Sequence, residues 1–319
     1  MIEIVALSDV MREAIRLAER VATTDANLLI SGESGSGKDA LALFIHSRSR
    51  RAPGSLVKID CATLPADLLE SELFGYERGA FTGAGEAKPG RLEAADGGTL
   101  VLDEIAHLSL GAQAKLLRVI EQREFERLGG RKTIKVDSRL IALTNTDLAD
   151  AVKRRAFRDD LFYRLNVVHL QLPPLRERGK DIAKLAQGFV RMYAVKHGRP
   201  VKGLSGEALD LLKTYDFPGN VRELANIIER AVIIANDSRI ETKDFPEGLQ
   251  AAATLRARQR RRPTLAEIEM GYICETLAAT RGNKAEAARI LGISRKNLYE
   301  RLARERSEVG DQMSEVRKH

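Results

Sequence analysis

Residues 32–39 combine residue types and spacing suited to binding phosphate. They read GESGSGKD, follow an apolar run and open a helical pattern, and the spacing GxxxxGK is that of a Walker A phosphate loop. Glycines let successive backbone N–H groups turn toward phosphate oxygens, and the N-terminus of a helix favours negative charge. Lys38 is expected to neutralise the β and γ phosphates of ATP, whereas Asp39 stands where the general motif has a Ser or Thr that reaches Mg²⁺. The residues expected to bind the nucleotide are Gly32, Glu33, Ser34, Gly35, Ser36, Gly37, Lys38 and Asp39.

A second apolar run, residues 99–102, ends in the acids Asp103 and Glu104, which is the Walker B form. Asp103 is expected to hold Mg²⁺ through water, and Glu104 is expected to orient and activate the attacking water. Acids after a strand are also favourable at the start of a helix, but a Walker A loop upstream makes that alternative the weaker one. Together the two motifs predict an ATPase that uses Mg²⁺ as its cofactor.

A parallel sheet is the element that brings such motifs together. Short β-rich apolar runs alternate with helical patterns, which predicts a parallel sheet covered by helices, an α/β fold. Ligand sites of these folds lie beyond the carboxyl ends of the strands, where both motifs stand. The predicted strands are residues 27–31, 56–59, 99–102, 140–144 and 167–170, and the predicted helices include 10–22, 38–47 and 110–121.

The second half of the chain is predicted to be helical. Pro173 and Pro174 end the alternating pattern, and the periodicity from 181 to 235 is helical throughout, with no strand-like alternation. An Ala- and Arg-rich stretch then predicts a mobile linker. The expected divisions are 1–172 for the α/β subdomain, 173–246 for a helical lid subdomain, 247–263 for the linker, 264–305 for an all-α domain and 306–319 for a tail.

Residues 283–299 indicate a helix, a turn and a second helix. Gly292 permits the tight turn and Ser294 is a good N-cap for the second helix, which predicts a helix-turn-helix DNA-binding domain. The alternative is a helical hairpin used only for dimerisation, but the start of the second helix is basic, as major-groove binding requires. The residues expected to contact DNA are Ser294, Arg295, Lys296, Asn297, Tyr299 and Arg301.

Composition and charge narrow the class of protein. The 319 residues are 44% hydrophobic with a net charge of +7, which allows a sizeable core and favours a polyanionic partner. Cys61 and Cys274 form no CxxC pair, so both are predicted to be reduced and buried. The first residues have no signal-type apolar core, and no run approaches the roughly 18 residues of a membrane span. We therefore expect a cytoplasmic protein with no membrane partner.

Residues 79–84 resemble the signature of one family. They read GAFTGA, follow ESELFG at 70–75 and stand between the two Walker motifs, as in the sigma-54-dependent enhancer-binding activators of the AAA+ class. The helix-turn-helix is similar to the Fis-type module that ends many of these activators, so the resemblance runs from Glu3 to Arg304. It implies that a loop contacts sigma-54 with Phe81 as an exposed aromatic anchor. The residues of this loop are Gly79, Ala80, Phe81, Thr82, Gly83 and Ala84.

The resemblance also implies roles for residues outside the Walker motifs. Asn145 matches sensor I, which monitors the γ-phosphate, and Arg222 matches sensor II on the lid. Arg158 and Arg164 match the arginine fingers, which reach the ATP of a neighbouring subunit and stabilise transition-state charge. Arginines that act in trans require an oligomer, so the resemblance implies a homo-oligomeric ring, usually a hexamer and sometimes a heptamer.

Three positions depart from the family pattern. Asp39 stands where the family usually has Glu, which keeps the charge. Asp60 stands where it usually has an Asn that holds the catalytic Glu inactive, so an acid replaces a neutral amide at a site expected to take part in catalysis. Phe217 replaces the usual Trp, which predicts a change in packing only.

The function implied is ATP-dependent transcriptional activation. The ring would bind palindromic enhancer DNA through its C-terminal domains, paired by helix 265–279, and hydrolysis would convert the closed complex of the sigma-54 RNA polymerase holoenzyme into the open complex. One alternative is a regulator with a vestigial ATPase, which the intact loop and Walker B motif oppose. Another is an AAA+ machine of a different class, which would lack the loop and the Fis-like tail. Family members commonly begin with a regulatory domain, and this chain begins near the ATPase boundary, so we expect ATP hydrolysis without a phosphorylation signal.

Overall fold

The computed structural model describes residues 4–250, 265–280 and 282–302. The chain folds as two compact units, 1–250 and 251–319. Most of the predicted linker and all of the predicted tail lie outside the described residues, and each unit is described by itself. Within the described residues, no helix is both long enough and apolar enough to cross a membrane.

The first unit is built on a five-stranded parallel sheet with the strand order β2-β5-β8-β1-β9. All five predicted strands are confirmed, and their ends move by no more than one residue. Continuous apolar runs suit such strands because both faces of a parallel sheet are covered by helices. The strands are β1 (Leu28–Ser31), β2 (Leu56–Asp60), β5 (Thr99–Asp103), β8 (Arg139–Thr144) and β9 (Val168–Gln171).

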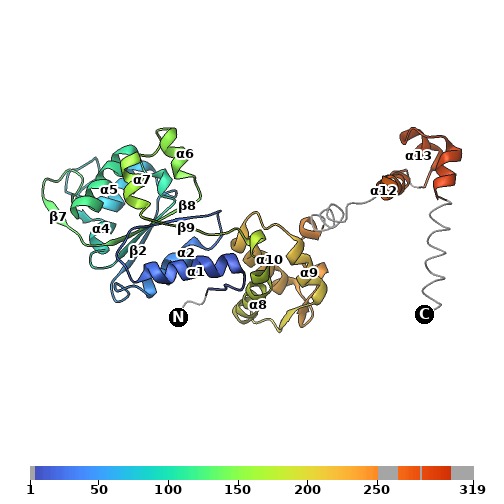
Figure 1. Cartoon of the computed structure of the whole chain (residues 1–319), viewed down its shortest axis with the longest axis horizontal. Helices are drawn as coiled ribbons and strands as arrows, with labels where there is room; N and C mark the ends of the chain where they lie inside the picture. Colours follow the sequence, from blue (N-terminus) through green and yellow to red (C-terminus); the bar gives the residue numbers. More distant parts are fainter. Residues whose placement is uncertain (1–3, 251–264, 281, 303–319) are drawn as a thin grey trace. The chain divides into compact units, whose positions relative to one another are not determined.

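Alternate residues of the three central strands, β5, β8 and β1, enter two separate cores, one on each face of the sheet. Leu28 and Ile30 join a core formed with helices α1 (Asp9–Ala22) and α2 (Lys38–Ser47), whereas Leu29 faces the opposite core. Figure 1 shows α1 and α2 together on one side of the strands and α5 and α7 on the other. The helices of the opposite face are α3 (Ala66–Phe74), α4 (Arg91–Ala94), α5 (Leu110–Gln122), α6 (Leu148–Lys153) and α7 (Asp159–Leu165).

Two small antiparallel pairs project beside this α/β core. Strands β3 (Gly75–Tyr76) and β4 (Lys88–Pro89) close the loop that contains GAFTGA, and β6 (Glu124–Glu126) and β7 (Thr133–Lys135) form a second hairpin. A single bridge between Tyr76 and Leu128 joins the two. A short 3₁₀ turn, Ile105–His107, follows β5.

The lid is a helical subdomain with its own core. It contains α8 (Gly179–Lys196), α9 (Gly206–Thr214) and α10 (Asn220–Ile234), with 3₁₀ turns at Leu175–Glu177 and Thr242–Asp244. Phe217 is fully buried in this core, edge-on to Tyr215. Residues 247–250, at the start of the predicted linker, are helical, and Leu249 packs into the same core.

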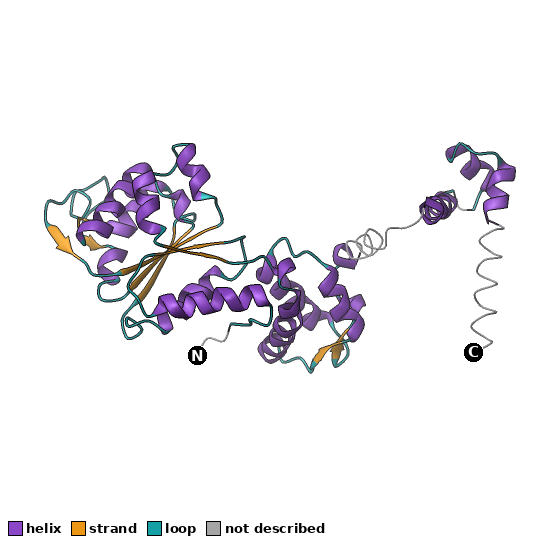
Figure 2. Cartoon of the chain, viewed as in Figure 1, coloured by secondary structure: helices purple, strands orange, loops and turns teal. Residues whose placement is uncertain are grey.

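The lid also contains a strand pair, one strand of which lies inside the segment predicted to be helical. Strand β10 (Gly203–Leu204) lies parallel to β11 (Arg239–Ile240), seen as the short orange pair in Figure 2. The prediction of helix throughout 181–235 was therefore wrong at this point. Two-residue strands are too short to produce an alternating pattern, and backbone hydrogen bonds from tertiary packing make the pair.

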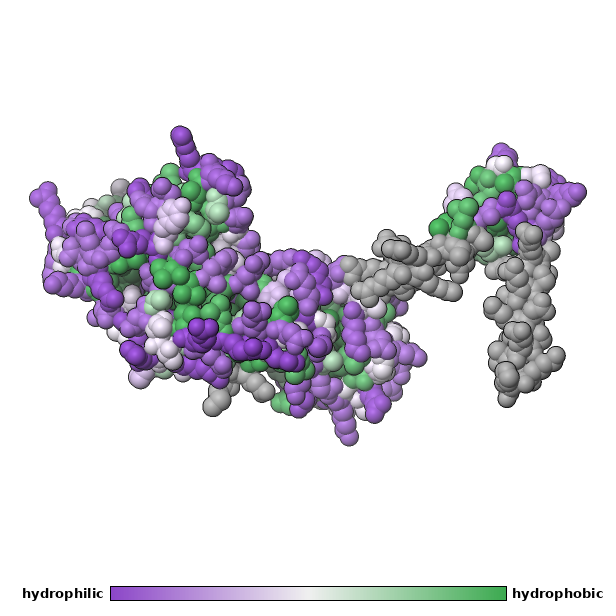
Figure 3. All heavy atoms as spheres, viewed as in Figure 1, coloured by the Kyte–Doolittle hydropathy of each residue, from purple (hydrophilic) through white to green (hydrophobic). Residues whose placement is uncertain are grey.

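A buried carboxylate fastens the N-terminal segment to the lid. Asp181, fully buried at the start of α8, accepts hydrogen bonds from the backbone N–H groups of Leu7 and Ser8 and from the Ser8 hydroxyl. These three hydrogen bonds replace those that the carboxylate would make with water, which offsets much of the free energy needed to bury it. On the surface of this unit, Figure 3 shows mainly hydrophilic residues on the visible face, with smaller hydrophobic patches.

The second unit contains a small helical module. Helices α12 (Leu265–Ala279) and α13 (Lys284–Ile290) and a helix at 295–302 pack around Ile273, Ala287, Ala288 and Leu298. Cys61 of the first unit is buried, as predicted, but Cys274 is exposed, so its predicted burial was wrong. Each residue of a helix is rotated by about 100° from the last, so when Ile273 faces the core its neighbour faces outward.

Candidate nucleotide site and interaction surfaces

The Walker motifs and the lid line one cleft of about 260 Å³ at the carboxyl ends of the strands. The core contributes the phosphate loop and the two acids after β5, and the lid contributes side chains from α8 and α10. The predicted nucleotide residues in this cleft are Ser34, Gly35, Gly37, Lys38, Asp39, Asp103, Glu104 and Arg222. The structure thus brings together motifs that are nearly 190 residues apart, as the span from Ser34 to Arg222 shows.

Lys38 lies at the centre of the phosphate loop. Its ammonium donates to the backbone carbonyls of Gly32 at 2.8 Å and Glu33 at 3.3 Å, and lies 3.9 Å from Glu104 Oε1. Burial lowers the pKa of Lys38, and the nearby acids oppose that effect. A buried cation surrounded by loop carbonyls is suited to binding a strong anion.

The loop fits a phosphate group. Ser36 is 1% exposed, and its hydroxyl oxygen has no hydrogen-bond partner. Buried hydroxyls are normally paired, so the unpaired Ser36 hydroxyl is an exception within the loop, although Ser36 does not line the cleft. Gly37 has φ +107°, and no atom lies within 4 Å of where its Cβ would be. Helix α2 begins at the next residue, with its N-terminal N–H groups at the same place.

The carboxylates of Glu104 and Asp60 have different hydrogen-bond partners. Glu104 Oε2 accepts a hydrogen bond from the backbone N–H of Asn145 at 3.1 Å. Asp60, in contrast, accepts from the N–H of Ala62 at 2.9 Å, in its own turn. Glu104 has the unusual backbone angle φ +52°, which aims its side chain into the cleft at a cost in strain.

Three charged side chains meet beside the Walker B acid. The ammonium of Lys58 lies 2.5 Å from Asp39 Oδ1 and 2.8 Å from Asp103 Oδ2. Partial burial lowers the pKa of Lys58, but hydrogen bonds to Asp103 and Asp39 outweigh it and raise that pKa above its usual value. Lys58 is not among the site residues predicted from the sequence, although a lysine in an otherwise apolar strand was a usable signal.

The donors at this point fit Mg²⁺. Carboxylate oxygens are the ligands that Mg²⁺ prefers, and it usually binds one or two of them together with phosphates and water. Asp103 and Asp39 supply such oxygens at the edge of the cleft. Among the described residues no group of three or more His, Cys, Asp or Glu is placed to hold a metal ion by itself.

The lid contacts the phosphate loop directly. Arg222 Nη1 donates to the Ser34 hydroxyl at 3.0 Å, and the N–H of Val221 donates to the carbonyl of Gly35 at 3.0 Å. A Cβ on Gly35 would lie 2.3 Å from the carbonyl oxygen of Gly219. Only glycine permits this approach, so the second glycine of the loop is needed for the packing of the lid against the loop.

Two arginines at the junction of core and lid were also missed. Arg176 forms two hydrogen bonds with Glu33, at 2.6 and 2.9 Å, and the Asn220 amide donates to the same carboxylate. These bonds lower the pKa of Glu33, with Arg176 the larger cause. Arg178 is buried and donates to the carbonyl of Ser36 at 2.5 Å. Both follow Pro174, and this basic run beside the lid boundary was the available signal.

Of the two predicted arginine fingers, Arg158 is the N-cap residue of α7 and Arg164 lies in its last turn, and neither lines the cleft. Arg158 forms a two-pronged ion pair with Asp160, at 2.6 and 3.0 Å, and Arg164 pairs with Glu121 at 2.9 Å. Their side chains are 41% and 61% exposed. Exposed pairs of this kind are weak, so both guanidinium groups are available to another subunit.

The Gly79–Ala84 loop is compact and its tip, residues 81–83, is exposed, whereas Ala84 at its end is buried. The N–H of Gly79 donates to the carbonyl of Ala84 at 2.8 Å, and Phe81 is 43% exposed with its ring 5.0 Å from that of Tyr76. A Cβ on Gly129 would lie 2.8 Å from the Cβ of Ala80, so the neighbouring hairpin rests against the loop. Phe81 therefore offers an aromatic surface on a supported tip.

Arg127 anchors the base of this loop. Its guanidinium donates to both carboxylate oxygens of Glu93, at 2.7 and 2.9 Å, and to Glu77 at 3.1 Å. Glu77 lies just before the loop, and its N–H donates to the carbonyl of Leu128. The hydrogen bonds from Arg127 lower the pKa of Glu93, so the network is fully formed at neutral pH.

The second unit has the geometry expected of a helix-turn-helix. Gly292 has φ +68° at the turn, and the Ser294 hydroxyl accepts from the N–H of Asn297 at 3.2 Å as the N-cap of the second helix. Lys296 is highly exposed, and Arg295 is exposed. Asn297 Oδ1 accepts from Arg301, and Arg301 also pairs with Glu269, so these two have partners within the module.

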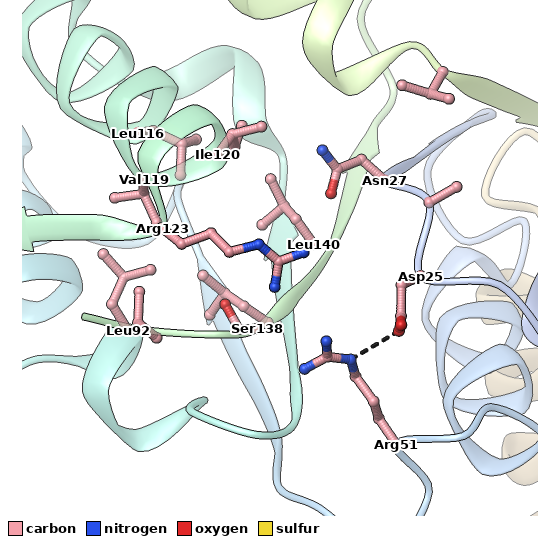
Figure 4. Close-up of a pocket in the computed structure, with 14 residues that line it drawn as sticks. Asp25, Asn27, Arg51, Leu92, Leu116, Val119, Ile120, Arg123, Ser138 and Leu140 are labelled. Carbon is pink, nitrogen blue, oxygen red and sulfur yellow. Dashed lines mark hydrogen bonds and ion pairs between the residues drawn. The ribbon is translucent and has the colours of Figure 1, made fainter.

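A further cavity, of about 240 Å³, lies at the opposite ends of the strands (Figure 4). Arg51 points toward Asp25 there, at 2.8 Å, and also binds Asp137 at 3.0 Å. Arg123 pairs with Asp137 as well. Both arginines are therefore matched by acids of the protein.

The fold and the cleft together define a class of protein. A phosphate loop between β1 and α2, acids at the end of β5 and a helical lid over the cleft are the features of a P-loop NTPase core of the AAA+ type. The model of the AAA+ ATPase lid domain matches residues 176–262. The Sigma-54 interaction domain matches residues 4–171, and the bacterial regulatory protein Fis family matches 264–304. The chain belongs to the family of sigma-54-dependent transcriptional activators, with an ATPase-type domain and a Fis-type DNA-binding domain.

Curated relatives agree with this membership. The chain is 46% identical over 319 residues to the transcriptional regulatory protein FlbD of Caulobacter vibrioides, covering 95% of this chain and 70% of FlbD. It is 45% identical to the regulatory protein AtoC of Escherichia coli, covering 92% of this chain and 66% of AtoC. The chain thus spans about two thirds of the length of these relatives.

Solved structures agree in fold. NtrX from Brucella abortus in complex with ATP superposes with a TM-score of 0.73 at 34% identity, covering 95% of this chain and 69% of that one. Its complex with ADP gives a TM-score of 0.71 at 33% identity over 95% and 69% of the two chains. These likenesses support nucleotide binding by the fold.

Proposed function

We propose that this chain hydrolyses ATP within a ring-shaped homo-oligomer, usually a hexamer, and uses the energy to convert the closed complex of sigma-54 RNA polymerase into the open complex. The observation that carries the proposal is the single cleft in which the phosphate loop, both Walker B acids and Arg222 of the lid meet. Membership of the sigma-54-dependent family supplies the polymerase as partner.

In the proposed reaction the triphosphate lies along the phosphate loop. Lys38 and Arg222 balance its negative charge, and the Ser36 hydroxyl donates to a phosphate oxygen. Glu104 accepts a hydrogen bond from the attacking water and orients it toward the γ-phosphorus, as general-base groups do in P-loop enzymes. Mg²⁺, when bound at Asp103, would neutralise charge on the β and γ phosphates.

A complete site in this proposal requires a second subunit. Arg158 and Arg164 are exposed, are held only by surface ion pairs and lie outside the cleft of their own chain. An arginine supplied in trans stabilises charge that develops on the transferred phosphoryl group. Hydrolysis should therefore depend on assembly.

Restraint of Glu104 is proposed to involve Asn145. Sensor I would report the γ-phosphate through the hydrogen bond from its backbone N–H to the catalytic carboxylate. Asp60 carries a charge like that of Glu104, and carboxylates of like charge do not bind each other. We therefore assign Asp60 a place beside the catalytic pair and not a direct hold on Glu104.

The energy of ATP hydrolysis is proposed to act on the polymerase through the Gly79–Ala84 loop. The exposed tip of this loop presents Phe81 and Thr82. The C-terminal modules would place the ring on palindromic enhancer DNA, with α12 pairing two of them and Lys296 and Arg295 in the major groove. Arg301, Tyr299, Asn297 and Ser294 complete the proposed DNA surface.

The test is the rate of ATP hydrolysis per chain, measured against protein concentration. The rate per chain of the wild type should rise cooperatively with protein concentration, because each site needs an arginine from a neighbouring subunit. Glu104→Gln should lose hydrolysis while still binding ATP, since the amide cannot act as a base. A rate per chain that is the same at every concentration would contradict the ring, and an unchanged rate in Glu104→Gln would contradict the assigned base.

A further inference from the structure

The ammonium of Lys58 lies against the two carboxylates that are expected to face a bound Mg²⁺. It bridges Asp39 of α2 and Asp103 of β5, at 2.5 and 2.8 Å. Asp103 is only 14% exposed, so this pair is less screened than an ordinary surface pair. The other ion pair at the cleft, between Lys38 and Glu104, is longer, at 3.9 Å.

The position of Lys58 follows from the sheet. Strands β2 and β5 are parallel neighbours, with Lys58 beside Val101 and Asp60 beside Asp103. Side chains two residues apart lie on the same face of a sheet, and a long side chain reaches the diagonal neighbour. Lys58 therefore reaches the Walker B acid from a strand that is otherwise apolar up to Asp60.

We propose that Lys58 is a positioning residue that competes with the divalent cation for Asp103 and so sets the Mg²⁺ concentration at which the nucleotide site fills. This inference rests on the proposed function of the cleft as an ATP site. The metal, through its bound water, and the ammonium need the same carboxylate oxygens, and two positive charges a few ångströms apart repel each other. Asp39 is the more exposed acid and gives the ammonium a second partner when Asp103 binds the metal.

The competition gives two effects of opposite sign. A neutral side chain at position 58 removes the competitor, so metal should bind more tightly. It also removes a positive charge near the triphosphate, so nucleotide should bind more weakly when no metal is present. A residue that served only to stabilise the fold would not change these two affinities in opposite directions.

The experiment titrates Mg²⁺ into the full chain with a fluorescent, non-hydrolysable ATP analogue, starting from a metal-free solution. We expect Lys58→Met and Lys58→Gln to reach half-saturation at about tenfold less Mg²⁺ than the wild type, a modest effect because Lys58 is 42% exposed. Both should bind the analogue more weakly without metal. Lys58→Arg, which keeps the charge, should follow the wild type.

Lys115→Met is the matched control. Lys115 is 46% exposed and pairs with Glu70 at 2.5 Å, but it lies on α5 and does not line the cleft. Titrations of the two neutral Lys58 variants that coincide with those of the wild type and this control would overturn the role of Lys58 alone. Failure of every protein, wild type included, to bind the analogue at any Mg²⁺ concentration would overturn the proposed function and this inference with it.

Discussion

Arg222 on lid helix α10 donates a hydrogen bond to the hydroxyl of Ser34 in the phosphate loop, at 3.0 Å. Next to it, the N–H of Val221 donates to the carbonyl of Gly35. The lid is therefore joined to the loop at the point where the nucleotide phosphates are proposed to bind. Substitutions in the lid and substitutions in the phosphate loop should therefore both change the affinity for ATP.

Replacing Arg222 should weaken ATP binding. In Arg222→Ala the triphosphate loses one positive partner, and a hydrogen bond to a charged group is worth about 2 kcal/mol, which corresponds to a dissociation constant raised about thirtyfold. Equilibrium titration with a fluorescent ATP analogue measures this constant. Arg230→Ala is the control, because Arg230 is exposed on the same helix and does not line the cleft. Equal affinities for the two variants would rule out the role given to Arg222.

Two glycine-to-alanine changes should shift stability in opposite directions. Gly35→Ala places a Cβ 2.3 Å from the Gly219 carbonyl oxygen at φ +73°, so it should lower the free energy of unfolding by about 1–3 kcal/mol. Gly188→Ala, inside α8 with no atom near its Cβ, should raise it by about 0.5–1 kcal/mol. Denaturant unfolding gives both values. Stabilisation by Gly35→Ala would contradict the close contact of loop and lid.

The base of the Gly79–Ala84 loop should lose stability in acid. The hydrogen bonds from Arg127 hold the pKa of Glu93 below its unfolded value, so the contribution of this pair is present above the unfolded pKa. It is lost as the pH falls through the lower folded pKa, when Glu93 takes up a proton. Glu93→Gln should therefore show a smaller loss of thermal stability than the wild type between neutral pH and about pH 3.

Glu19→Gln is the comparison for that pH series. Glu19 is an exposed acid of α1, so removing its charge should leave the profile of the wild type. If the profile of Glu93→Gln follows that of Glu19→Gln at every pH, the ion pair of Glu93 with Arg127 does not contribute as assigned.

Mixing two inactive variants should restore hydrolysis. Arg158→Ala keeps its own Glu104 but offers no arginine, and Glu104→Gln offers Arg158 but cannot activate water. In a mixed ring some sites combine an intact Glu104 with an intact Arg158 of the neighbour, so the mixture should hydrolyse ATP well above the sum of the two alone. A steady-state phosphate assay measures the rate. A mixture no faster than that sum would exclude action of Arg158 in trans.

Local pattern was enough to predict much of the fold and part of the site. Every strand of the main sheet was predicted to within one residue, because a buried parallel strand is a continuous apolar run between turn signals. The phosphate loop and the Walker B acids, Asp103 and Glu104, were found because their chemistry fixes both residue type and spacing.

Contacts between distant segments could not be predicted in this way. The partners of Glu33, which are Arg176 and Asn220, lie more than 140 residues away in the lid. Lys58 meets Asp103 only because β2 and β5 are neighbours in a sheet whose order differs from the order of the sequence. The pairing of β10 with β11 is also made by tertiary contact, since two residues carry no periodic signal.

Promoter opening by purified sigma-54 RNA polymerase tests the central claim most directly. Strand separation at a sigma-54-dependent promoter should be detected with the wild type and ATP, and should be absent with a non-hydrolysable analogue. Thr82→Ala should keep most of the ATPase rate but open no promoter, because the loop that transmits the work is altered. Promoter opening without hydrolysis, or undiminished opening by Thr82→Ala, would contradict an ATP-driven motor that acts on sigma-54 through the Gly79–Ala84 loop.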